Sequence, residues 1–176
     1  MGDKPMLAFL NITFQTCLIP GTSAQESGLK VSAEKQRDET ILFYRVDCND
    51  GRKCLNMSGE GKKICDYLVF YTKNEDSGEI LCFLELKGGG EEDAIKQILS
   101  TYDGMLTLLK LKFTGKQYSS TIEHLVCKAC ICLHGQTPTG NQRAKEALFK
   151  RFGRGNVRIK YGIRHYKLLA DFLRER

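Results

Sequence analysis

No apolar run in this sequence approaches the roughly 20 residues that a membrane-crossing helix needs, so we expect no membrane partner. The apolar run Leu7–Leu10 is too short to be the core of a signal peptide, which favours a cytoplasmic protein. Internal repeats and low-complexity segments are also lacking. With 176 residues, the chain is long enough for one domain with a sizeable hydrophobic core.

A disulfide framework is not expected, although the chain has eight cysteines, because such frameworks belong to small secreted domains without an adequate core. The spacing Cys127-x-x-Cys130-x-Cys132 could be half of a zinc or iron–sulfur site. However, residues 125–133 read as a buried strand, in which Cys127 faces away from the other two. We therefore favour core thiols and keep a cysteine-ligated metal as the alternative.

The net charge of +6 is concentrated near the end of the sequence. Residues 141–176 hold eleven Lys or Arg against three Asp or Glu, a net of +8, so the first 140 residues carry −2. A basic third on a nearly neutral body suits a polyanionic partner, most simply nucleic acid. A solvated basic face is the alternative.

The stretch Glu79–Gly88 is an apolar strand with one carboxylate and one amine near its end, Glu85 and Lys87. Because side chains alternate along a strand, these two share a face with Leu81 and Phe83. A strand that is apolar on both faces is normally central in its sheet. The preceding strand, within residues 62–71, carries Asp66, and the turn residues 74–78 between the strands predict an antiparallel pair that brings Asp66 to Glu85.

An Asp followed by Glu-x-Lys on the next strand resembles the PD-(D/E)xK nuclease superfamily, although Cys65 stands where a proline would precede Asp66. The resemblance implies a restriction-endonuclease-like fold, Asp66 and Glu85 as ligands of Mg²⁺ or Mn²⁺, and Lys87 as the catalytic lysine. The residue types suit this chemistry. Two carboxylates repel unless a cation lies between them, and Mg²⁺ prefers hard oxygen ligands.

Other residues are candidates for the same site. Related nucleases carry a glutamine on the helix after the Glu-x-Lys strand, where Gln97 lies here. Asp47, at the end of an expected strand over residues 40–47, is a rival to Asp66. Many members of the superfamily also have a glutamate on a helix before the sheet, and three candidates stay open: Glu26, Glu34 and Glu39. Arg158 and Lys160, alternating with apolar residues 157–163, predict a basic strand face that binds substrate.

Glycines 88–90 end the Glu-x-Lys strand, and no Gly-Lys-Ser/Thr follows, which argues against a phosphate-binding loop. The acidic residues 91–93 open a helix whose apolar face is Ile95, Ile98, Tyr102, Met105 and Leu109. We expect loops over 20–27, 49–61 and 114–121, a strand over 122–133, a helix over 141–152 closed by Gly153, and a helix over 165–174 with Leu168, Leu169 and Phe172 inward.

These elements predict an α/β protein, a single domain with a central mixed β-sheet flanked by helices. Its parts would be a poorly defined segment 1–40, a catalytic core 41–134 and a basic part 135–176. The function expected from the resemblance is a metal-dependent nuclease, DNA being favoured over RNA, in defence or repair, as a homodimer or a subunit of a larger defence complex. The alternative is a catalytically silent nucleic-acid-binding or assembly subunit that retains the fold.

Overall fold

The computed structural model describes residues 4–59, 61–73, 78–135 and 141–175, and their centre is a six-stranded mixed sheet. Its strands lie in the order β1–β4–β5–β6–β7–β8. The pairs from β1 to β6 are antiparallel, whereas β6, β7 and β8 run parallel. The bounds are β1 Leu18–Ile19, β4 Glu39–Arg45, β5 Tyr67–Lys73, β6 Glu79–Lys87, β7 Leu125–Leu133 and β8 Val157–Lys160.

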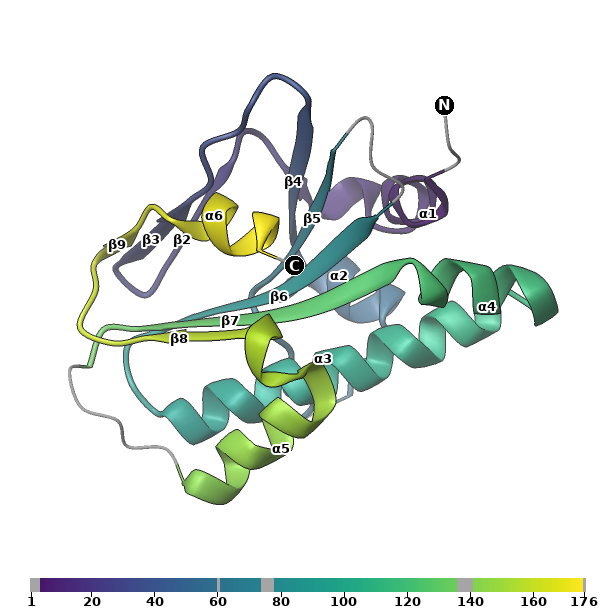
Figure 1. The fold of residues 1–176 in the computed structure, drawn as a ribbon. Helices are drawn as coiled ribbons and strands as arrows, with labels where there is room; N and C mark the ends of the chain where they lie inside the picture. Colours follow the sequence, from purple (N-terminus) through teal and green to yellow (C-terminus); the bar gives the residue numbers. More distant parts are fainter. Residues whose placement is uncertain (1–3, 60, 74–77, 136–140, 176) are drawn as a thin grey trace.

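Two different layers cover this sheet (Figure 1). Helices α3 (Glu91–Lys112) and α5 (Gln142–Phe152) lie on one face. The other face carries helix α6 (Leu169–Arg174) and a second, three-stranded sheet of β2 (Ser23–Glu26), β3 (Leu29–Ser32) and β9 (His165–Tyr166). The remaining elements are α1 (Pro5–Thr13), α2 (Asn49–Cys54), α4 (Gly115–Glu123) and the 3₁₀ turns Gln15–Cys17 and Arg154–Asn156. The predicted α/β class with a mixed sheet flanked by helices is confirmed, whereas the second sheet was not predicted.

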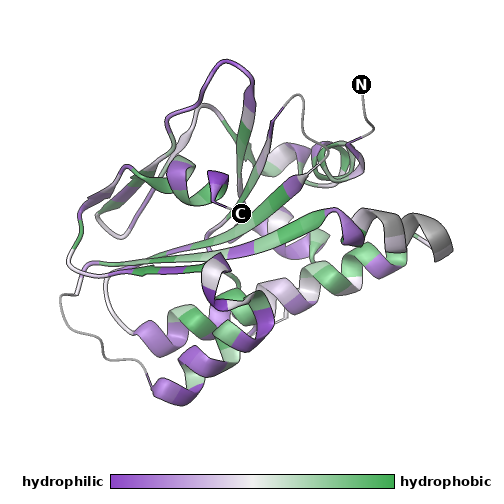
Figure 2. Cartoon of the chain, viewed as in Figure 1, coloured by the Kyte–Doolittle hydropathy of each residue, from purple (hydrophilic) through white to green (hydrophobic). Residues whose placement is uncertain are grey.

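Strand β6 is the centre of both hydrophobic cores, as its apolar pattern predicts. Phe83 and Ile98 of α3 belong to the core on one face, and Leu84 and Phe172 of α6 belong to the core on the other. Complete burial of each such side chain contributes about 1.5–3 kcal/mol. The colouring in Figure 2 shows hydrophobic residues along the central strands and hydrophilic residues on the outer side of α5. Among the described residues, no helix is long and apolar enough to cross a membrane.

The helix and strand predictions that rested on long periodic patterns are confirmed. Helix α3 begins at Glu91 and buries four of the five expected residues, while Tyr102 is half-buried against the same core. Strand β7 runs parallel to β6, but it begins at Leu125 rather than at the predicted residue 122, because residues 122 and 123 end helix α4. Helix α5 ends at Gly153 as expected, and the Asn141 side chain caps its first turn.

Three of the predicted loops are wrong in whole or in part. Residues 23–26 form β2, residues 49–54 form α2, and residues 115–123 form α4. In α2, an added Cβ on Gly51 would lie 2.3 Å from the Val46 carbonyl oxygen. Glycine therefore permits a close backbone approach here, although its residue type predicts a turn. The turn predicted at 74–78 lies mostly outside the described residues.

The last predicted helix is shorter than expected. Residues 165–166 pair with β3 as strand β9, and α6 begins only at Leu169. Leu169 and Phe172 are buried as predicted, whereas Leu168 is 58% exposed and does not point inward. The α6 side chains pack on the face of β6 that carries Leu84 and Leu86.

Candidate functional site

Asp66 and Glu85 meet at the end of the β5–β6 pair, as the sequence predicts. The last ladder partners are Tyr67 and Leu84, so the next positions along the two strands, 66 and 85, face each other. The backbone N–H of Asp66 donates to Glu85 Oε2 at 3.1 Å, and that of Leu86 donates to Asp66 Oδ2 at 2.8 Å. Each carboxylate therefore accepts a backbone N–H from the opposite segment, in the role that a backbone carbonyl oxygen has in a regular ladder.

Burial changes the acidity of this pair. Asp66 is 8% and Glu85 2% exposed. Desolvation, reinforced by the negative charge of Asp66, raises the pKa of Glu85 to about 9, although Lys87 opposes the change. Desolvation also raises the pKa of Asp66 to about 6, against the effect of its bond from the Leu86 N–H. At neutral pH, and with no cation bound, the pair therefore retains a proton on Glu85.

Lys87 lies two residues beyond Glu85 on the same face of β6, and Gln97 of α3 holds its ammonium group. The Lys87 Nζ donates to Gln97 Oε1 at 2.5 Å, and Gln97 Nε2 donates to the Ile64 carbonyl oxygen at 2.9 Å. Gln97 therefore connects the lysine to the segment that leads into Asp66. The structure thus brings together four of the predicted site residues: Asp66, Glu85, Lys87 and Gln97.

Thr101 also belongs to this arrangement, although it was not predicted from the sequence. Its Oγ1 donates to the Gln97 carbonyl oxygen at 2.7 Å and accepts from the Cys65 N–H at 2.8 Å. It is fully buried, one helical turn after Gln97. The i, i+4 spacing could have indicated a shared face with Gln97, but nothing local in the sequence places Cys65 beside it.

Asp47 and Glu26 lie at the edge of this site, and each is held by an arginine. Asp47 Oδ1 accepts from Arg52 at 2.6 and 2.9 Å, and Glu26 pairs with Arg45 at 3.0 Å. Both carboxylates act on Asp66 electrostatically and raise its pKa. Asp47 is therefore a neighbour of the pair rather than its replacement.

The other two glutamate candidates lie elsewhere. Glu39 starts β4 beside Lys73, at the end of the sheet away from Glu85, and accepts from Arg174 at 2.7 and 2.8 Å. These bonds lower the pKa of Glu39 to about 2. Glu34 is exposed between β3 and β4. The first helix, α1, carries no carboxylate, so the expected helix glutamate is not found there.

Arg158 and Lys160 lie on the opposite face of the sheet from the carboxylates. Ile159 shares a row with Ile131 and Glu85, so its two neighbours point to the other side. Arg158 stacks 5.0 Å from the Phe172 ring centre and pairs with Glu175, and Lys160 lies 5.8 Å from the Tyr166 ring centre. The predicted basic face is therefore packed against α6 and β9 rather than open.

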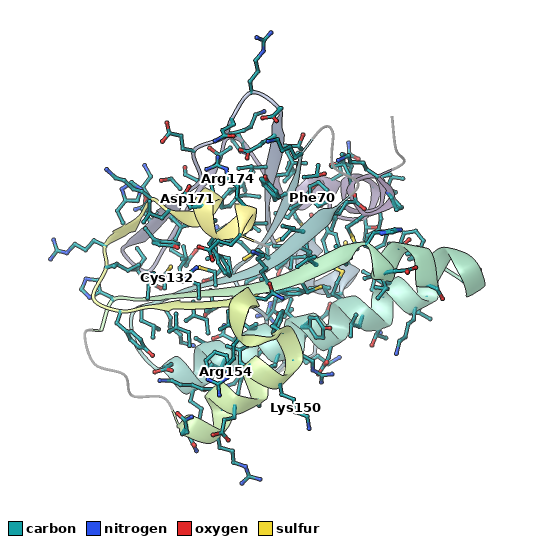
Figure 3. The ribbon with its side chains drawn as sticks, in the orientation of Figure 1. Phe70, Cys132, Lys150, Arg154, Asp171 and Arg174 are labelled. Carbon is teal, nitrogen blue, oxygen red and sulfur yellow. The ribbon has the colours of Figure 1, made fainter. Side chains whose placement is uncertain are left out.

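Other basic residues of the last third lie on the side of the sheet where α3 and α5 pack. Figure 3 shows Lys150 and Arg154 there, and Asp171 and Arg174 on α6 across the sheet. Lys150 and Arg154 are exposed, as is Arg143 at the start of α5. These three side chains lie on the same side of the sheet as Lys87, so they are better placed than Arg158 to contact a polyanion bound there.

The described residues include no group of three or more His, Cys, Asp or Glu side chains gathered as a metal site. All eight cysteines are free, and Cys130 and Cys132 are fully buried on the α6 face of β7, whereas Cys127 packs on the other face. The prediction of core thiols in this strand agrees with that arrangement.

Comparison of the chain with protein-family models, with curated proteins and with solved structures found no match in any of the three. The candidate site therefore rests on its own geometry: two buried carboxylates that face each other, a lysine on the same strand face, and a glutamine that fixes the lysine.

Proposed function

We propose that this chain is a metal-dependent nuclease that hydrolyses phosphodiester bonds, DNA being the first substrate to test. The observation that carries the proposal is the exchange of backbone bonds between Asp66 and Glu85, which holds two buried carboxylates together beside Lys87. Bringing two carboxylates together in a buried place raises the free energy of their ionised forms. A cation between them would offset this cost.

The donor set fits Mg²⁺ or Mn²⁺ bound mainly through water and substrate. Among the described hydrogen bonds, only one oxygen of each carboxylate accepts a backbone N–H, which leaves Asp66 Oδ1 and Glu85 Oε1 as hard-oxygen donors. Mg²⁺ often binds through one or two carboxylates and keeps several waters and phosphate oxygens as its other ligands. A bound ion of this kind would polarise a phosphodiester oxygen and lower the pKa of an attacking water.

Lys87 would stabilise charge on the reacting phosphate. Gln97 accepts one N–H of its ammonium group, which restricts the direction of the remaining two. As water attacks phosphorus and a P–O ester bond breaks, negative charge grows on the phosphate oxygens, and a fixed ammonium group stabilises it. Thr101 supports this geometry by bonding to the backbone of Gln97.

A catalytically silent nucleic-acid-binding or assembly subunit is the second candidate. The same hydrogen bonds also suit a purely structural role. The two carboxylates complete the end of the β5–β6 ladder, and Lys87 already bonds to Gln97. In this case removal of Lys87 would cost a little stability and no activity.

The deciding experiment is cleavage of circular and linear DNA and of RNA in Mg²⁺, Mn²⁺ or EDTA. We expect cleavage with either metal and none in EDTA. Lys87→Ala should bind nucleic acid nearly as well as the wild type and cleave about 10²–10³-fold more slowly in single-turnover assays. Lys87→Arg should be a poor substitute although it keeps the positive charge, because the larger, planar guanidinium group cannot take the position in which Gln97 holds the ammonium group.

Lys63→Ala is the matched control, because Lys63 is a nearby lysine whose partner is the exposed Asp93, at 2.6 Å. It should cleave at the wild-type rate. Undiminished cleavage by Lys87→Ala would remove the nuclease assignment from this motif, and absence of cleavage by the wild type on every substrate would favour the silent subunit.

A further inference from the structure

Two cysteines far apart in the sequence lie in contact beside β1, an edge strand of the six-stranded sheet. Cys17 ends the 3₁₀ turn Gln15–Cys17, Cys48 directly precedes α2, and their Sγ atoms are 3.8 Å apart. A disulfide bond is about 2.05 Å long, so a relative shift of a little under 2 Å would join them. Both lie on short elements with connecting segments, where a shift of this size is easier than within the central sheet.

The two thiols differ in a way that gives each a separate role. Cys48 is half-buried, and its sulfur accepts the Gly51 N–H at 3.3 Å and donates to the Arg45 carbonyl oxygen at 3.1 Å. Cys17 is only 3% exposed, and burial, together with the neighbouring Cys48, raises its pKa to about 12. A small oxidant therefore reaches Cys48 first, and Cys17 is held in contact behind it.

The other cysteines lack this arrangement. Cys130 and Cys132 are close neighbours on one face of β7, but both are fully buried in the sheet core. Cys54 lies on α2 near the pair, but its sulfur donates to the Thr13 carbonyl oxygen at 3.0 Å. Cys127 is half-buried on β7, so it is a control whose exposure is similar to that of Cys48.

We infer that Cys48 is an oxidation site for hydrogen peroxide and that Cys17 is its resolving thiol, the product being a Cys17–Cys48 disulfide. The Cys48 thiolate, its proton lost to solvent, attacks one peroxide oxygen. The O–O bond breaks, the second oxygen leaves and takes up a proton as water, and Cys48 becomes a sulfenic acid. The Cys17 sulfur, as it loses its proton, then attacks Cys48 Sγ. The S–S bond forms, the S–O bond breaks and a second water leaves, so two thiols are oxidised and one peroxide is reduced.

The sequence allows a direct assignment of the cross-link. Trypsin places Cys48 in the peptide 46–52 and Cys54 in a separate peptide that begins at residue 54, while Cys17 lies in a peptide that ends at Lys30. The folded protein is treated with hydrogen peroxide, remaining thiols are alkylated, and the digest is analysed by mass spectrometry without reductant. We expect peptide 46–52 joined to the Cys17 peptide, lighter by two hydrogen atoms than the sum, and separated again by dithiothreitol.

Variants distinguish the two roles. Cys17→Ala should abolish the cross-link and leave a Cys48 sulfenic acid that dimedone traps in higher yield than in the wild type. Cys48→Ser should abolish both signals. Cys54→Ser and Cys127→Ser should keep the wild-type yield of cross-link. Circular dichroism and Cys17→Ser, which retains the size of the side chain, check that the fold is kept.

Three results would overturn the inference. They are a cross-link from Cys48 to Cys54 in place of Cys17, dimedone labelling of Cys127 at the same rate as Cys48, and direct oxidation of Cys48 to sulfinic acid without any cross-link in the folded wild type. The outcome does not depend on nuclease activity, because every measurement is made on the protein alone.

Discussion

Glu85→Gln tests the most unusual feature of the site, a carboxyl group whose pKa is raised to about 9 by burial and by Asp66. The glutamine keeps an oxygen that can accept the Asp66 N–H, which the Glu85 carboxylate accepts at 3.1 Å. The substitution therefore removes the titration and leaves the hydrogen bond in place. We expect a pH dependence of stability in the wild type that the variant lacks.

The sign follows from proton linkage. The folded protein holds a proton on Glu85 between the ordinary pKa of 4.5 and about 9, whereas the unfolded chain releases it near 4.5. The contribution of this proton to the stability of the folded protein is fully present below pH 4.5 and is lost as the pH rises through about 9. A difference of one bound proton over the three pH units from 5.5 to 8.5 lowers the free energy of unfolding by at most about 4 kcal/mol. Because the buried site relaxes when Glu85 ionises, we expect a loss of about 2 kcal/mol.

The assay is urea unfolding of both proteins at pH 5.5 and 8.5 in EDTA. With a slope of about 2 kcal/mol per molar urea, the wild-type midpoint should fall by about 1 M between these pH values, beyond any fall seen in Glu85→Gln. The titration of Asp66, with a pKa of about 6, contributes to both proteins at the lower pH. Saturating Mg²⁺ at pH 8.5 should raise the free energy of unfolding of the wild type by about 2–3 kcal/mol and leave that of Glu85→Gln nearly unchanged. Equal pH slopes in the two proteins would refute the assignment of the raised pKa to Glu85.

Three further predictions follow from the contacts. Mg²⁺ or Mn²⁺ should raise the melting temperature of the wild type but not that of Asp66→Asn, measured by calorimetry, and an equal rise would place the metal elsewhere. Replacing Lys150 and Arg154 together by Ala should reduce the salt slope of nucleic-acid binding by about one unit per lost phosphate contact, measured by fluorescence anisotropy, whereas replacing Arg158 and Lys160, which pack on α6 and β9, should leave the slope unchanged; a lower slope only in the second variant would contradict this placement. Gly51→Ala should destabilise the protein by about 2–4 kcal/mol in urea unfolding, because its Cβ would lie 2.3 Å from a backbone oxygen, whereas Gly155→Ala, with nothing within 4 Å, should cost less than about 1 kcal/mol; equal effects would contradict this close approach.

The strongest sequence patterns predicted the middle of the molecule. The apolar run of β6 determined a central strand, because a strand that is apolar on both faces must be covered on both. Alternation placed Glu85 and Lys87 on one side of it, and the 3.6-residue period predicted the buried face of α3, whereas Gln97 became a candidate only through the resemblance to nucleases. These are local regularities of the backbone, so the sequence contains them directly.

Short elements were predicted poorly, because tertiary contacts override weak local preferences. Segment 49–54 contains Asp, Asn and Gly, which are typical of turns, yet it folds as helix α2, where Gly51 packs against Val46. Segment 23–26 has no clear strand pattern, and its pairing with β3 is what makes it a strand.

By itself the sequence determined which residue types the site has and that Glu85 and Lys87 share one face of a strand, whereas Asp66, expected within the neighbouring strand, directly precedes β5. Only the tertiary structure decided that the two carboxylates bond to each other's strands, that burial raises the pKa of Glu85, and that Thr101 supports Gln97. It also decided that Arg158 and Lys160 face α6 and β9, because the register of β7 against β8 sets which side of the sheet each residue takes. Register and burial depend on contacts between residues far apart in the chain, and no local pattern in the sequence encodes them.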